Sequence, residues 1–192
     1  DKGYSLTDAH DIGLITRKEN DYYDMFFNRI MFPIIDEAGH VLGFSGRVFD
    51  GDTSGGKYVN TQETVIYKKG EMLYNLNNAI PHIRKMGRVI LCEGQMDVIS
   101  LSNAGIKEVV CSLGTALTEQ QASLIKKYSN NVLICYDGDS AGIKATGKAF
   151  NLLKGLTVNS ITLPNGMDPD EYLKSRGKDS FLEFIESNQK DV

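Results

Sequence analysis

The feature that most constrains the fold is an alternation in the second half of the chain. From Arg88 onward, short apolar runs rich in β-branched residues alternate with longer stretches whose apolar residues recur every three or four positions. The short runs predict strands at residues 89–92, 109–113, 132–136 and 158–163. The longer stretches predict helices at 96–104, 118–128 and 141–153. This order is typical of a parallel sheet with crossover helices, covered on both faces.

The first half of the chain has a different pattern. Longer strand candidates cover residues 22–27, 29–35 and 41–49, and a hairpin turn is expected at Asp36 to Gly39. Residues 50–56, rich in Gly, Asp and Ser, predict an exposed loop. A helix is expected at 73–85 despite Pro81, and two short helices are expected near 171–175 and 181–187.

These patterns predict an α/β protein with three regions. We expect a smaller mixed α+β subdomain over residues 1–87, a parallel-sheet domain with crossover helices over 88–173, and a C-terminal helical segment over 174–192. No apolar run approaches the roughly 20 residues of a membrane-spanning helix, so we expect a cytoplasmic protein without a membrane partner. The chain begins without Met, and we expect it to be a piece of a longer protein.

The net charge argues against one class of nucleic-acid-binding protein, and the cysteines and histidines do not indicate a metal site. The net charge of −4 argues against a protein that binds nucleic acid through bulk positive charge, so any contact with DNA should be local. The three cysteines lie in apolar runs without zinc-ligand spacing, and the three histidines are scattered. We assign neither residue type a chemical role.

Acidic residues follow three of the predicted strands. Glu93 follows the first strand, Asp137 and Asp139 follow the third, and Asp168 and Asp170 follow the last. In open parallel sheets, ligands bind beyond the carboxyl ends of the strands. Helix capping is the alternative interpretation of each residue. Capping, however, requires neither a glycine between two aspartates nor a glutamate at the end of an apolar strand.

Several carboxylates at one edge of a sheet would repel one another and raise one another's pKa. A divalent cation relieves that repulsion, and Mg²⁺ suits the site because it takes carboxylate oxygens while keeping positions for water and substrate phosphate. The sequence therefore predicts metal-assisted phosphoryl or nucleotidyl transfer at this edge.

The carboxylate set resembles the Toprim domain, which is shared by bacterial primases, type IA and II topoisomerases and some nucleases. The resemblance spans Arg88 to about Leu173. Its matching motifs are Glu93-Gly94, Asp137-Gly138-Asp139 and Asp168-Pro169-Asp170. One departure is Gln95, where many family members have Tyr. We expect it to be tolerated, because the chemistry needs carboxylates and a tight glycine there more than an aromatic ring.

Three further segments are similar to signatures of the DnaG-type primase catalytic core. They are Arg29-Ile30-Met31-Phe32-Pro33-Ile34 with Gly43-Phe44-Ser45-Gly46-Arg47, Lys57 to Thr64 with Tyr67 to Gly70, and Ser112 to Thr118. This resemblance covers nearly the whole chain. It implies a DNA-directed RNA polymerase of the bacterial replication fork, which synthesises short RNA primers on single-stranded DNA from ribonucleoside triphosphates.

The same resemblance implies roles for particular residues and partners. Glu93, Asp137 and Asp139 are the implied catalytic residues and, with Asp168 and Asp170, the ligands of Mg²⁺ or Mn²⁺. The implied contacts to triphosphate or template phosphates are Arg29, Lys57, Lys69 and Arg47. Without the resemblance, Lys57 and Lys69 would be interpreted as solvated surface charges. Zinc is implied only for a separate N-terminal domain, and the replicative helicase only through a C-terminal domain, both outside this sequence.

Two alternatives stay open. A Toprim nuclease or topoisomerase uses a similar acidic cluster to break DNA, and a topoisomerase also needs a nucleophilic tyrosine. None of the nine tyrosines stands in a recognisable breakage motif. A nucleotide-sensing module would instead use the acidic edge only to hold a metal, and would bind nucleotides without turnover.

Overall fold

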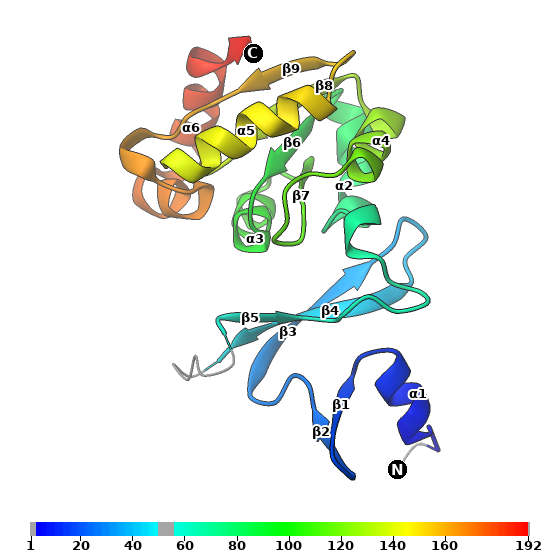
Figure 1. Cartoon of the computed structure of the whole chain (residues 1–192). Coiled ribbons are helices and arrows are strands. Elements are labelled where there is room, and N and C mark those ends of the chain that lie inside the picture. Colours follow the sequence, from blue (N-terminus) through cyan, green and yellow to red (C-terminus); the bar gives the residue numbers. More distant parts are fainter. Residues whose placement is uncertain (1–2, 50–55, 192) are drawn as a thin grey trace. The chain divides into compact units, whose positions relative to one another are not determined.

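The structure, a computed structural model, describes residues 3–49 and 56–191 (Figure 1). The chain forms two compact units, Asp1–Lys69 and Gly70–Val192. The mixed architecture with a parallel sheet confirms the expected fold class. Of the loop expected at 50–56, residues 50–55 lie outside the described part. Among the described helices, none is long and apolar enough to cross a membrane.

The described residues of the first unit form one helix and two antiparallel sheets. Helix α1 (Leu6–Asp11) precedes the pair β1 (Ile15–Lys18) and β2 (Asp21–Asp24). The second sheet has the order β3-β4-β5, formed by β3 (Arg29–Ile35), β4 (Val41–Val48) and β5 (Tyr58–Asn60). The β3–β4 hairpin confirms the turn at Asp36 to Gly39. The Asp36 carboxylate fixes this turn by accepting from the backbone N–H groups of Ala38 and His40 at 2.9 and 2.8 Å.

The strand expected at residues 22–27 is shorter in the structure. β2 ends at Asp24, whose carboxylate accepts the backbone N–H of Phe26 at 2.7 Å and so turns the chain out of the strand. The Phe26 ring then packs edge to face on Phe44, with 6.2 Å between centroids. A Cβ at Gly46 would lie 2.7 Å from the Phe26 ring, so a glycine is needed there for this packing.

The second unit is built on a five-stranded sheet of order β10-β9-β8-β6-β7. Four strands are parallel: β6 (Val89–Cys92), β7 (Val109–Cys111), β8 (Asn131–Cys135) and β9 (Thr157–Ser160). The short edge strand β10 (Lys190–Asp191) runs antiparallel to β9. The described part of the chain also has two 3₁₀ turns, η1 (Lys69–Glu71), where the sequence passes from the first unit to the second, and η2 (Pro164–Gly166).

Helices cover both faces of this sheet (Figure 1). One face packs against α2 (Leu76–Met86), α4 (Glu119–Tyr128) and α5 (Ser140–Leu152). The other packs against α3 (Gln95–Asn103) and α6 (Pro169–Asn188). Along β6, Leu91 belongs to the first core and Ile90 to the second, as strand alternation requires. Burial on both faces explains why the strands are uninterrupted apolar runs.

Helices α2 and α6 need separate description. α2 packs Leu76, Ala79 and Ile83 into the core of the second unit, whereas the sequence placed it before a boundary at residue 87. Its apolar residues recur at helical spacing and match the sheet face, so the second compact unit begins at Gly70. α6 is broken at Gly177, where φ is 79°, and its two arms correspond to the two short helices expected near 171–175 and 181–187.

Two glycines of α5 should respond oppositely to alanine. A Cβ at Gly142 would clash with the Asp137 carbonyl oxygen, whereas a Cβ at Gly147 would meet nothing within 4 Å. We expect Gly142→Ala to destabilise the protein by about 1 to 3 kcal/mol through overpacking. Gly147→Ala should stabilise it by up to about 1 kcal/mol through helix propensity. Urea denaturation of both variants measures the difference, and equal effects would contradict this packing at the start of α5.

Candidate active site

The strand order places a topological switch point between β6 and β8. From β6 the chain crosses to β7 on one side, and the next strand, β8, lies on the other side of β6. The carboxyl ends of β6 and β8 are in register at Cys92 and Cys135. Glu93 follows the first of these ends, and Asp137 lies two residues beyond the second. Open α/β sheets bind ligands in the crevice at such a point.

The loop between Asp137 and Asp139 packs tightly on the turn that precedes Asp168. The backbone N–H of Gly138 donates to the Met167 carbonyl at 3.2 Å. A Cβ at Gly138 would lie 2.5 Å from the Leu163 carbonyl oxygen, so no side chain fits there. The glycine between the two aspartates therefore lets the second acidic motif pack on the turn that leads to the third.

Two of the predicted ligands also cap helices. Asp139 accepts the backbone N–H groups of Ala141 and Gly142 at 2.9 and 2.8 Å, at the start of α5. Asp168 accepts the backbone N–H of Glu171 at 2.7 Å, at the start of α6. All three bonds use the Oδ1 atom. A carboxylate has about four acceptor positions, so capping and metal binding are compatible at these residues.

Glu93 does not cap a helix. Its Oε2 atom is buried and has no hydrogen-bond partner. A buried carboxylate oxygen without a partner is costly, and a bound cation is one way to satisfy it. The helix that follows begins at Gln95, and the backbone N–H of its N-cap residue, Gly94, donates to Asp97 Oδ2 at 3.1 Å.

The acidic side chains at this edge influence one another's charge. Burial first, and then the charges of Glu93, Asp168, Asp139 and Glu171, raise the pKa of Asp137 to about 6. These residues follow three different strands of the second unit. Because their charges act on Asp137 together, the fold brings the three acidic motifs to the same edge of the sheet.

Asp97 is a residue to which the sequence assigned no role. It is buried, with 5% of its surface exposed. Burial first, and then Asp168 and Asp137, raise its pKa to about 7. Its Oδ1 atom also accepts the backbone N–H of Asp170 at 3.4 Å. Asp97 thus joins the loop after β6 to the start of α6, and its position three residues after Gly94 was the signal that could have identified it.

Asp170 is held by its neighbours. Its carboxylate accepts a short hydrogen bond from the Ser100 hydroxyl and pairs with the Lys174 ammonium at 2.6 Å. A metal ion on Asp170 would compete with Lys174, so this assignment stays a prediction.

The donor set fits a divalent cation. Glu93 offers a buried oxygen without a partner, and Asp137 carries a charge that its neighbours disfavour. Within residues 3–49 and 56–191, no three His, Cys, Asp or Glu side chains converge closely enough to hold an ion by themselves. Mg²⁺ commonly uses one or two carboxylates with waters and substrate phosphate, and an open set of this kind suits it. Glu93, Asp137 and Asp139 are the residues that would hold it.

The predicted basic residues do not share one face of their sheet. Arg47 lies opposite Tyr58 across β4 and β5, and its guanidinium carbon is 5.8 Å from the centre of that ring. Arg29 pairs with Val48, the residue after Arg47, and therefore belongs to the other face. Its guanidinium donates to the carbonyls of Gly46 and Gly56 at 3.0 and 3.1 Å, which gives it a structural role. Lys57 is exposed and Lys69 half-buried.

The raised pKa of Asp137 predicts a pH-dependent stability. Because its pKa is about 6 in the folded chain against an ordinary value of 3.8, the folded state binds the proton more tightly than the unfolded state. Metal-free protein should therefore lose stability as the pH rises from about 4 to 6. Asp137→Asn should melt at a higher temperature than the parent at pH 8, and the gap should shrink toward pH 5. A gap that does not change with pH would contradict this electrostatic account.

Two family profiles match the chain. The Toprim-like family matches residues 90–173, and the N-terminal domain of the DNA primase catalytic core matches residues 1–80. A DNA primase of Staphylococcus aureus (strain COL) is 45% identical over 193 residues, which cover 98% of this chain and 32% of that protein. The chain therefore spans about a third of the length of the curated relatives it matches.

Solved structures show the same similarity. The zinc-binding and RNA polymerase domains of the Aquifex aeolicus primase superpose with a TM-score of 0.91 at 39% identity, covering 97% of this chain and 47% of that one. A DnaG primase catalytic domain bound to single-stranded DNA gives a TM-score of 0.87 at 38% identity, covering 95% and 58%.

Proposed function

Because this chain belongs to the bacterial DnaG-type primases and carries part of their catalytic core, we propose that it is a DNA-directed RNA polymerase that makes short primers for replication. The proposed reaction is nucleotidyl transfer. A primer 3′-hydroxyl attacks the α-phosphorus of a ribonucleoside triphosphate, and pyrophosphate leaves. Mg²⁺ or Mn²⁺ is the proposed cofactor.

The observation that carries the proposal is the buried, unpartnered Oε2 of Glu93 at the switch point between β6 and β8. A divalent cation, when bound there, would lower the pKa of the attacking hydroxyl and offset the charge that develops on the phosphate. Glu93, Asp137 and Asp139 would orient it. Asp139 is fixed by its two bonds to the start of α5, so its geometry is set before substrate arrives.

Asp97 is proposed to position this edge. It is the N3 residue of α3, and it bonds both Gly94, next to Glu93, and the start of α6. It would therefore hold the first and third acidic motifs at a fixed separation. Asp168, at the start of α6, would then face the side of the site that binds the substrate triphosphate. Asp170 would be a further ligand, of a second ion.

The proposed partners follow from the relatives. The catalytic domain that resembles this chain was solved with single-stranded DNA, and the Aquifex aeolicus relative joins zinc-binding and RNA polymerase domains. We propose a single-stranded DNA template, ribonucleoside triphosphates and an RNA primer as partners. A zinc-binding domain and a helicase-binding domain would belong to segments outside this sequence, and the site of action would be the replication fork in the bacterial cytoplasm.

The direct test is incorporation of labelled ribonucleotides on a single-stranded template with Mg²⁺ or Mn²⁺. The expected product is a short polymer that alkali destroys and that requires the template. Cleaved template without any ribonucleotide polymer would support a Toprim nuclease instead. Nucleotide binding without turnover, under conditions that support a related primase, would support a nucleotide-sensing module.

A further inference from the structure

The edge of the sheet opposite the carboxylates carries the opposite charge. Helices α2 and α4 both end there, beside the first residues of β6 and β8. Their last turns carry Arg84 with Lys85 and Lys126 with Lys127. All four side chains are exposed. In a chain whose net charge is −4, this is a local concentration of positive charge.

These helix ends border an open, shallow cavity of about 400 Å³, which we call the basic cavity. It is lined by Arg84, Lys126, Lys127, Tyr128, Asn130 and Asn131, among others, and none of its lining residues is acidic. Its base is tied together by hydrogen bonds. The Ser129 hydroxyl and the Asn131 amide both donate to the Gly87 carbonyl, at 3.1 and 2.8 Å. The end of α2 is thereby fixed to the start of β8.

An aromatic ring lies among these cations. The Arg84 guanidinium carbon is 5.9 Å from the centre of the Tyr128 ring, and the Lys127 ammonium is 5.1 Å from it. Tyr128 is half-buried and packs partly on the core beneath α2 and α4. The cavity therefore combines an aromatic side chain with positive charge.

Cations in the last turn of a helix also compensate the helix dipole, and that effect accounts for charge at these positions. It does not account for a cavity in which cations from two helices surround one tyrosine and two asparagine side chains. Placing like charges together costs energy, which an anionic ligand would recover. Aromatic faces beside cations are the arrangement that proteins use for single-stranded nucleic acids, whose bases are free to stack.

We propose that the basic cavity binds the phosphodiester backbone of a single-stranded nucleic acid, with a base stacked on Tyr128. Lys126, Lys127 and Arg84 would contact phosphates, and Asn130 and Asn131 would offer amide groups to the sugar or base. A duplex fits less well, because its base faces are already stacked. This inference rests on the proposed function only for the identity of the bound strand. It gives the strand a second binding site, at the edge of the sheet opposite the carboxylates.

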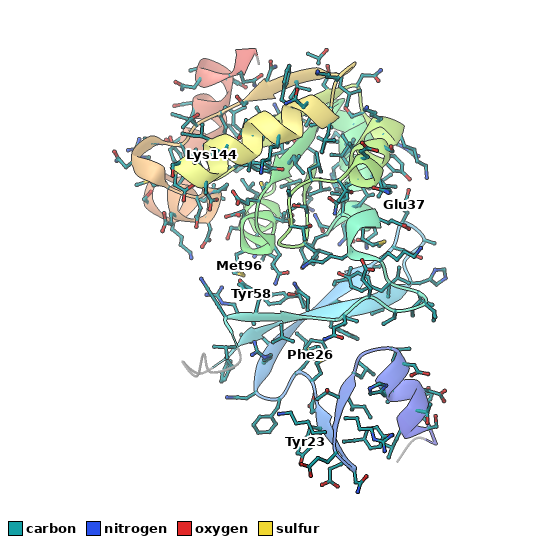
Figure 2. All side chains as sticks on the ribbon, viewed as in Figure 1. Tyr23, Phe26, Glu37, Tyr58, Met96 and Lys144 are labelled. Carbon is teal, nitrogen blue, oxygen red and sulfur yellow. The ribbon has the colours of Figure 1, made fainter. Side chains whose placement is uncertain are left out.

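The test measures binding without catalysis. Fluorescence anisotropy of a labelled oligothymidylate, in EDTA and without nucleotides, compares Lys126→Gln/Lys127→Gln with Lys144→Gln/Lys148→Gln. The control removes two exposed lysines from α5, where Lys144 is labelled in Figure 2. We expect the first variant to bind roughly tenfold more weakly, with a salt slope reduced by about 1.4 for two lost phosphate contacts. Equal affinities of the two variants would overturn the proposal.

A second variant tests stacking. Tyr128→Leu keeps an apolar side chain over the core but removes the ring. It should weaken binding of oligothymidylate about tenfold and leave binding of an abasic strand of the same length unchanged. Equal loss with both strands would contradict base stacking on Tyr128. If Lys126→Gln/Lys127→Gln lowers the melting temperature but not the affinity, the lysines serve only the helix ends and the proposal is wrong.

Primer synthesis separates this inference from the proposed function. Lys144→Gln/Lys148→Gln should retain the parent rate, because these lysines lie outside both the acidic edge and the basic cavity, whereas Lys126→Gln/Lys127→Gln should need more template to reach half of its maximal rate. Synthesis by the parent protein together with unchanged strand affinity of Lys126→Gln/Lys127→Gln would refute the basic cavity alone. Absence of synthesis in the parent protein, with the affinity difference intact, would refute the polymerase assignment and leave the cavity as a strand-binding site.

Discussion

Replacing Glu93 with glutamine is expected to abolish primer synthesis while the protein stays folded. Glutamine has nearly the same shape but no negative charge, so it cannot balance a divalent cation. Loss of several kcal/mol of charge stabilisation corresponds to a fall of roughly a thousandfold or more in rate. Because Glu93 Oε2 has no hydrogen-bond partner, the substitution breaks no bond of that atom. The rate of labelled ribonucleotide incorporation measures the effect.

A matched control is Glu183→Gln, which removes the same charge from an exposed position on α6. It should retain activity close to that of the parent. Circular dichroism and thermal melting should show both variants folded. Near-normal synthesis by Glu93→Gln would contradict the assignment of this residue as a metal ligand.

The second large effect is expected at two lysines of the first unit. If Lys57 and Lys69 contact triphosphate or template phosphate, Lys69→Ala should reduce primer synthesis about ten- to a hundredfold. A lost charge-assisted contact to phosphate is worth roughly 1.5 to 3 kcal/mol. Calorimetric titration of Mn²⁺ should show that metal binding persists, because both lysines belong to a different compact unit from the carboxylates.

Lys68→Ala is the control for this pair. Lys68 is exposed and adjacent to Lys69 in the chain, and we expect its replacement to change synthesis little. Unimpaired synthesis by the Lys57→Ala/Lys69→Ala double variant would show that the basic contacts are elsewhere, even if the carboxylate site is correct. The opposite faces of Arg29 and Arg47 already indicate that the four predicted basic residues do not form one continuous surface.

The acidic site was predictable because it depends on a simple rule. Apolar runs identified the strands, and Glu93 and Asp137 follow strands that are neighbours in the sheet. Parallel strands bring their carboxyl ends to one edge, so the order of elements was enough to gather these residues. A glycine between two aspartates is unusual in the sequence, but the reason for it, the close approach of the Leu163 carbonyl to Gly138, is visible only in the structure.

Other features depend on contacts that no local pattern encodes. Asp97 bonds the backbone of Asp170, 73 positions away, through packing of α3 on α6. β5 is only three residues long and gave no alternation signal. Arg29 and Arg47 lie on opposite faces of their sheet because Arg29 pairs with Val48 and not with Arg47. A shift of one residue in the pairing would put both on the same face, so only the register of the hairpin in the structure separates them.

The central claim is that this acidic edge holds the cation for nucleotidyl transfer. Anomalous diffraction from a crystal soaked in Mn²⁺ tests it most directly. The account predicts a peak at the acidic edge, held by Glu93, Asp137 and Asp139 directly or through waters, and loss of that peak in Glu93→Gln crystals. A peak bound elsewhere in a protein that synthesises primers, with none at these three residues, would contradict it.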